Sequence, residues 1–308
     1  MKDEALITHT RHVRRSTITT AAAIAGALIF LAPAGSALAA KGGNGNANAG
    51  GPSDPENPVK TIGGVFRDFR KHNQPGGHPD FGKIPNAGEG HTVGNVLPTL
   101  DADGKPVYTG VGLVVTSQWR DAMGRSIHPS QFDAARGDIP GSYGTPDDGA
   151  IDSTFSYSQW YRDVPGLNTS AAFSLNLDQK PDGLGWILDE KIKTNQAIIG
   201  GGSNSNFEYS YEIEMTLDYI PGTGQFLTIG GMDDMFAYIN GQIVVDLGGV
   251  NHGTRQTVHL DRLGLDPNAT NTLKIFMTER IKQREDIYFE FGFDVTPGKI
   301  PTTMAMYD

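Results

Sequence analysis

Residues 207–219, with the sequence FEYSYEIEMTLDY, carry an apolar side chain at every second position for thirteen residues. Side chains alternate between the two faces of a β-strand, so this period of two predicts a long strand with one buried face. A helix would instead need apolar positions three or four residues apart. The stretch therefore predicts that this part of the chain belongs to a sheet, one face of which packs against a hydrophobic core.

Shorter strand patterns recur about every ten residues, with turn signals between them. Asn240-Gly241 is typical of a two-residue hairpin turn joining two apolar runs. This spacing predicts an all-β chain whose strands pack as a β-sandwich with long loops, one of them at residues 130–155. The other expected strands are 59–65, 173–177, 225–230, 235–240, 242–246, 256–260, 271–278 and 286–295.

The N-terminus has the three parts of a secretory signal peptide. Arg11, Arg14 and Arg15 precede an apolar stretch at residues 20–31, and Ala37-Leu38-Ala39 supplies an A-x-A cleavage site. The apolar stretch is too short to favour a transmembrane anchor. We expect residues 1–39 to be removed and the mature protein to be secreted, with no membrane span. Removal takes away four basic and two acidic residues, which changes the net charge from -10 to -12.

The remaining chain reads as a linker, one domain and a short tail. Residues 40–58 are rich in Gly, Asn, Ala and Pro and have no apolar periodicity, as expected of a linker. We assign one domain to residues 59–300 and a tail to residues 301–308. The sequence contains no cysteine, so a secreted form would depend on its core, helped by metal, rather than on disulfides.

Charge and missing motifs narrow the functional classes. A net charge of -10 makes nucleic acid an unsuitable partner. The sequence has no G-x-S-x-G nucleophile motif, no P-loop and no dinucleotide fingerprint, so we expect a non-catalytic protein. A glycan-processing enzyme stays open as an alternative, because paired carboxylates can lie anywhere in a sequence this rich in acids.

Three carboxylates flank the expected hairpin. Asp233 and Asp234 precede its first strand, and Asp246 ends its second strand. A hairpin can bring its two ends close together, and carboxylate oxygens are the hard ligands that calcium prefers. The alternative is that these aspartates occupy ordinary turns, where Asp is common. Asn251 and His252 follow the same hairpin and are further candidates for binding a ligand.

Four stretches carry a resemblance to a known family. The chain is similar to the fibro-slime domain, a variant of the PA14-like β-sandwich of secreted adhesive and matrix proteins. The matching stretches are VFRDF at 65–69 with HPDF at 78–81, GKPVY at 104–108, QWYRDVPGLN at 159–168, and residues 231–280 with their ING, VVDLGG, LGL and ER motifs.

The resemblance implies a ligand site as well as a fold. In the lectin members of the PA14-like family two adjacent aspartates hold calcium, and the calcium holds sugar hydroxyls. Asp233-Asp234 stands at the matching position, and Met232 stands where fibro-slime sequences often have a third acid. The expected metal is therefore Ca²⁺ at Asp233, Asp234 and Asp246.

These expectations combine into a secreted calcium-dependent carbohydrate-binding module for adhesion or an extracellular matrix. Trp160 is a candidate for stacking on a sugar ring, if its face is exposed. Glu279-Arg280 is expected to form ion pairs near a strand end. The alternative is a structural matrix protein that binds another protein, for which residues 207–219 would supply a free strand edge.

Overall fold

The computed structural model of the protein describes residues 58–83, 90–190, 207–231, 233–251, 253–281 and 287–299. The chain divides into two compact units, residues 1–44 and residues 45–308, and the first unit lies outside the described residues. The predicted signal peptide, the predicted linker up to residue 57 and the predicted tail also lie outside them.

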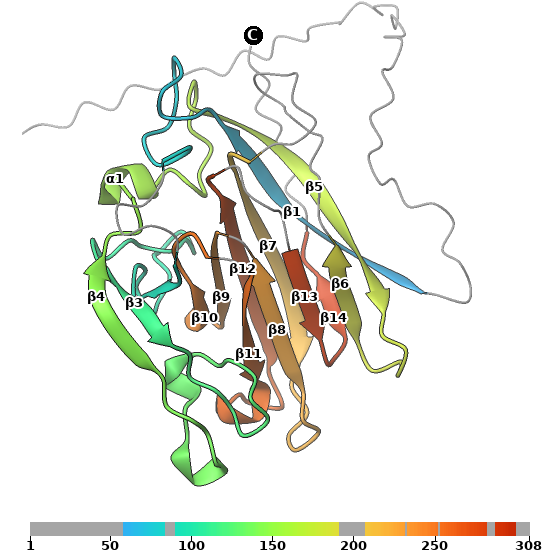
Figure 1. Ribbon diagram of the computed structural model, residues 1–308. Helices are drawn as coiled ribbons and strands as arrows, with labels where there is room; N and C mark the ends of the chain where they lie inside the picture. Colours follow the sequence, from blue (N-terminus) through green and yellow to red (C-terminus); the bar gives the residue numbers. More distant parts are fainter. Residues whose placement is uncertain are drawn as a thin grey trace, which may run out of the picture. The chain divides into compact units, whose positions relative to one another are not determined.

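One large antiparallel sheet organises the second unit (Figure 1). Within the described residues it has eleven strands, and the all-β prediction is confirmed. The strands, in their order across the sheet, are β10 (Gln242–Leu247), β9 (Asp234–Ile239), β12 (Thr270–Glu279), β7 (Tyr209–Asp218), β1 (Val59–Phe69), β5 (Asn168–Gln179), β6 (Trp186–Glu190), β13 (Ile287–Phe291), β8 (Phe226–Gly231) and β11 (Thr254–His259), with β14 (Val295–Pro297) paired to β7.

The sheet folds over so that its two halves bury a common core. Ile213 of β7 and Ile275 of β12 are fully buried in one cluster with Ile229 of β8 and Phe289 of β13. The alternation seen in residues 207–219 is the direct cause, because every second side chain of β7 enters this cluster. We call this cluster the main core. Its burial of large apolar side chains is the dominant stabilising term in such a fold.

The strand β7 lies inside the sheet rather than at its edge. Ile213 is paired with Gly64 of β1 on one side and with Ile275 of β12 on the other. Its backbone hydrogen-bonding groups are therefore used within the chain. The alternative in which this strand pairs with a partner protein is wrong, because β7 has no free edge along this register.

The predicted hairpin turn is confirmed between β9 and β10. Asn240 and Gly241 have φ values of 51° and 77°, the left-handed conformation that a type I′ turn requires at both positions. Asn and Gly adopt it at little cost, which is why this dipeptide marks such hairpins. The turn sets the register that pairs Leu247 with Met235, next to Asp234.

A small sheet lies beside the β10 end of the large sheet (Figure 1). It contains β2 (Thr92–Val93), β3 (Gly112–Ser117) and β4 (Ser142–Asp147), and backbone bridges tie Thr92 to Gly248 and Thr99 to Gln242. The expected long loop at 130–155 is thus wrong in part, because β4 lies within it. The sequence SYGTPD contains a proline and a glycine, which disfavour a strand, so its composition did not predict β4.

The remaining elements are short helices, one of which, α1 (Thr154–Tyr157), contributes Tyr157 to a second core. The α-helix α1 begins at Ser153, which caps it, and the 3-10 helices are η1 (Pro129–Gln131), η2 (Ala134–Arg136) and η3 (Leu260–Arg262). No helix in the described part of the chain has the length and apolar composition that crossing a membrane requires. The second core contains Phe69, Phe81, Val96, Tyr108, Ile151, Tyr157, Trp160, Tyr161, Phe236, Tyr238 and Phe276.

Candidate functional site

The aspartate pair lies at the start of β9 and is almost completely buried. Asp233 and Asp234 are 2% and 1% exposed. Asp234 is paired with Thr278 of β12, so the end of β12 and the residue after it, Arg280, lie against the pair. A solvated turn, the alternative to a functional site, is therefore wrong for these two residues.

Arg280 is the cation that the pair holds. Its Nε donates to Asp234 Oδ2 at 2.7 Å, and its Nη2 lies 2.7 Å from the same oxygen. Both side chains are completely buried. Burial by itself lowers the pKa of the Arg280 guanidinium, but the charges of Asp234, Asp233 and Asp80 outweigh it and raise the pKa. Arg280 also donates from Nη1 to the Gly149 carbonyl at 2.8 Å, so it joins two distant loops.

Asp233 accepts a hydrogen bond from the backbone of the same arginine. Its Oδ2 accepts the backbone N–H groups of Arg280 at 2.6 Å and of Ile281 at 3.1 Å. Its Oδ1 is buried with no hydrogen-bond partner among the described residues. A cavity of about 10 Å³, lined by Asp233, Asp234, Thr278 and Glu279 among others, lies here, and it matches the space of one water molecule. Burial raises the pKa of Asp233 to about 7.

Asp246 is also buried, but it contributes to a different cavity. Its Oδ2 accepts the Gly94 backbone N–H at 2.8 Å, and its Oδ1 has no partner among the described residues. Burial raises the pKa of Asp246 to about 7, with Asp234 adding to the rise. Asp246 lines a cavity of about 450 Å³ beside the small sheet, and neither Asp233 nor Asp234 lines that cavity. The expected set of three calcium ligands is thus divided between two cavities.

Asn251 fixes the loop that follows β10. Its side-chain NH₂ group donates to the Asp233 carbonyl at 3.1 Å, and its Oδ1 accepts the Thr254 N–H at 3.2 Å. The side chain is 1% exposed. Asn251 therefore holds the aspartate pair and the loop together. His252 and Met232, which the sequence placed next to this site, lie outside the described residues.

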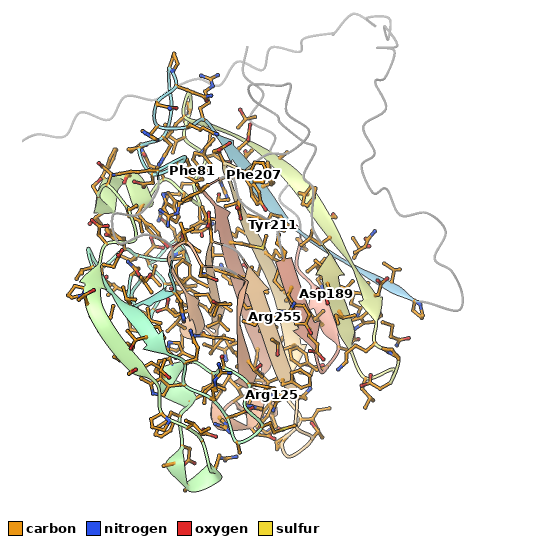
Figure 2. All side chains as sticks on the ribbon, viewed as in Figure 1. Phe81, Arg125, Asp189, Phe207, Tyr211 and Arg255 are labelled. Carbon is orange, nitrogen blue, oxygen red and sulfur yellow. The ribbon has the colours of Figure 1, made fainter. Side chains whose placement is uncertain are left out.

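Trp160 has no exposed face, so it is not a surface for stacking a sugar ring. It is completely buried between the aromatic rings of the second core, and its ring centroid is 5.8 Å from that of Phe81, a residue labelled in Figure 2. Its indole N–H donates to Asp80 Oδ2 at 2.9 Å. The Arg280 guanidinium lies 5.0 Å from its ring centroid. Trp160 therefore supports the arginine from one side as a cation–π partner.

Sequence reasoning assigned Arg280 only an ion pair near a strand end and did not connect it with Asp234. The signal in the sequence is weak, since an arginine after a strand is common. Sequence reasoning also did not identify the exposed apolar residues Val111, Leu113 and Tyr143, which line the same cavity as Asp246. Within the described residues no group of three or more His, Asp or Glu side chains is arranged to hold a metal ion, so a metal here would need backbone oxygens or water in its shell.

Comparisons with known proteins found similar proteins in Dictyostelium discoideum. No family model matches the chain. Protein psiC of Dictyostelium discoideum is 30% identical over 222 residues, which cover 67% of this chain and 36% of psiC. Protein psiQ of the same organism is 27% identical over 166 residues, which cover 48% of this chain and 17% of psiQ. The chain thus spans about a third or less of the length of these curated relatives.

Two solved structures were also found to be similar. One is a PA14 sugar-binding domain from an RTX adhesin, with 11% identity, a TM-score of 0.23, and coverage of 77% of this chain and 99% of that domain. The other is a GH31 alpha-xylosidase from Xanthomonas citri, with 11% identity, a TM-score of 0.25, and coverage of 74% of this chain and 22% of that enzyme.

Proposed function

We propose that the protein is a secreted, non-catalytic carbohydrate-binding module of the fibro-slime type, and that calcium supports its binding site. The observation that carries the proposal is an excess of buried negative charge. Asp233, Asp234 and Asp246 are all at least 97% buried, and Arg280 is the cation in contact with the pair. Uncompensated buried carboxylates are costly, so a second cation would lower the free energy of the folded state.

The donors around Asp233 fit calcium in their chemistry. A hard carboxylate oxygen, Asp233 Oδ1, has no partner and lies beside a cavity of about 10 Å³. Asp234 is the second carboxylate of the pair, and the Asn251 NH₂ group donates to the backbone carbonyls of Asp233 and Gly249 beside it. Calcium bound there would offer its open coordination positions to the neighbouring hydroxyl groups of a sugar.

Thermal unfolding tests the calcium part of the proposal. Residues 40–308, which remain after the predicted signal peptide, are measured with calcium and with a chelator, beside an Asp233→Asn/Asp234→Asn variant. We expect calcium to raise the melting temperature of the wild type by mass action and to leave that of the variant unchanged. The matched control is Asp178→Asn/Asp218→Asn, which removes the same charge from two exposed strand positions.

The outcomes separate the parts of the proposal. A calcium-dependent rise that persists in the Asp233→Asn/Asp234→Asn variant would place the metal elsewhere. No rise in the wild type would remove calcium while leaving carbohydrate binding to be measured directly on a glycan array. Binding to no glycan on the array, with and without calcium, would reject the carbohydrate function itself.

A further inference from the structure

An apolar hollow lies between the small sheet and β10. Its volume is about 450 Å³, within the range of small-ligand sites. β2 and β3 contribute Val93 and Leu113, β4 contributes Tyr143, and β10 contributes Ile243 and Asp246. Figure 1 shows β3 and β4 in green beside this end of the large sheet. We call it the β4 cavity.

The walls of the β4 cavity expose apolar groups to solvent. Val111, Leu113 and Tyr143 are 51%, 37% and 43% exposed, and all three line it. The rings of Tyr143 and Trp119 pack together, with their centroids 4.5 Å apart, so the tyrosine ring is held in place. A rigid, partly exposed aromatic ring on an apolar wall is a surface on which the C–H face of a sugar ring can pack.

One carboxylate in this wall lacks a counter-charge. Asp246 is 3% exposed, its Oδ2 is held by the Gly94 N–H, and its Oδ1 has no partner among the described residues. No lysine or arginine lines the β4 cavity. His128 does line it, but burial lowers the pKa of His128 to about 4, so this imidazole is neutral at physiological pH. The electrostatic complement of the cavity is therefore a cation with an apolar body.

We propose that the β4 cavity binds an amino-sugar residue, with the ammonium group donating to Asp246 and the sugar ring packed on Tyr143. The proposal rests on the proposed function, because it takes the ligand to be carbohydrate. An ammonium group matches the site better than a hydroxyl, since it neutralises the buried charge and makes a charge-assisted hydrogen bond. The net charge of -10 also favours a cationic glycan at long range.

This site is separate from the aspartate pair. Asp233 and Asp234 do not line the β4 cavity, and Asp246 does not line the small cavity beside Asp233. Binding of the amino sugar is therefore expected to be the same in calcium and in chelator. That independence distinguishes the inference from the calcium part of the proposed function.

Isothermal titration with three short oligosaccharides of equal length tests the proposal: glucosamine, N-acetylglucosamine and glucose oligomers. The titrations use the wild type in chelator, at an ionic strength of about 0.15 M, which screens long-range attraction. We expect the glucosamine oligomer to bind at least about tenfold more tightly than the other two. Asp246→Asn keeps the acceptor for the Gly94 N–H and is expected to lose this preference, and Tyr143→Ala is expected to weaken all binding.

The matched control is Asp178→Asn, which removes one exposed charge far from any role in the cavity and is expected to bind as the wild type does. Equal affinity for all three oligomers would overturn the ammonium inference and leave carbohydrate binding standing. A glucosamine preference that survives in both Asp246→Asn and Tyr143→Ala would show that the β4 cavity is not the site. Circular dichroism of each variant separates lost binding from lost folding.

Discussion

Replacing Arg280 by methionine tests the internal ion pair directly. Methionine keeps an unbranched apolar stem and removes the charge. The change leaves Asp234 without its partner at 2.7 Å, and it leaves the Gly149 carbonyl without its donor at 2.8 Å. Because both charged side chains are completely buried, removing one of them costs about 3–5 kcal/mol. That loss is a large share of the about 5–15 kcal/mol that stabilises an ordinary domain.

Urea unfolding in the presence of chelator measures this loss. Arg280→Met is compared with Arg120→Met, a control at an exposed arginine that is expected to change the free energy of unfolding by less than about 0.5 kcal/mol. The double variant Asp234→Asn/Arg280→Met removes both charges and is expected to be more stable than the sum of the single losses by about 1–3 kcal/mol. A loss below about 1 kcal/mol for Arg280→Met, or full additivity in the double variant, would refute the buried pair.

The same variant examines the competition between arginine and calcium. Without the guanidinium, the Asp234 carboxylate is free to take a metal ion in its place, while Asp233 keeps its backbone N–H donors. We therefore expect calcium to raise the unfolding midpoint more in Arg280→Met than in the wild type. An equal response of the two proteins would mean that Arg280 and calcium do not share these carboxylates.

Three further outcomes are expected. Burial raises the pKa of Asp246 in the folded protein to about 7, so its contribution to stability is present below about pH 4 and is lost as the pH rises to 7. In chelator, the Asp246→Asn variant should therefore gain stability relative to the wild type across this window, by at most about 1.4 kcal/mol per pH unit. A stability difference that does not change with pH would contradict this. Gly64→Ala should cost about 1–3 kcal/mol in urea unfolding, because a Cβ there would lie 2.0 Å from the Glu212 carbonyl oxygen, whereas Gly90→Ala meets nothing within 4 Å and serves as the control. Trp160→Phe keeps the ring packing and leaves Asp80 Oδ2 without the indole N–H donor, so the free energy of unfolding is expected to fall by about 1–3 kcal/mol. An unchanged melting curve would show that this hydrogen bond is unimportant.

The strands were predictable because their signals are local. Alternation within residues 207–219 identifies β7, and Asn240-Gly241 fixes the turn of the β9–β10 hairpin. The strand β4 was missed because its proline and its glycine disfavour strands in general, and only its pairing with β3 makes it one. The pairing with β3 is a tertiary contact, and the local sequence of β4 carries no signal of it.

The candidate site was predictable in its residue types but not in its contacts. Asp233-Asp234 is identifiable from position and from family resemblance, whereas its partner Arg280 lies 46 or more residues further along the chain. Their contact depends on the register of β12 against β9, which brings Thr278 opposite Asp234. Trp160 was a candidate for stacking on a sugar ring if its face is exposed, yet both Trp160 and its neighbour Tyr161 follow a short helix into the second core.

The position of β1 between β5 and β7 has a consequence for the order of folding. The first described strand of the chain cannot complete either of its ladders early, because its closest partner in sequence, the pair Phe69–Asn168, is separated by 99 positions. Contacts between such distant residues form only after a large loop has closed. The entropy lost in closing that loop slows folding. During synthesis β1 therefore stays unpaired until about a third of the chain has followed it. The adjacent glycines Gly63 and Gly64 at its centre make it a poor template for premature pairing with another molecule in that interval.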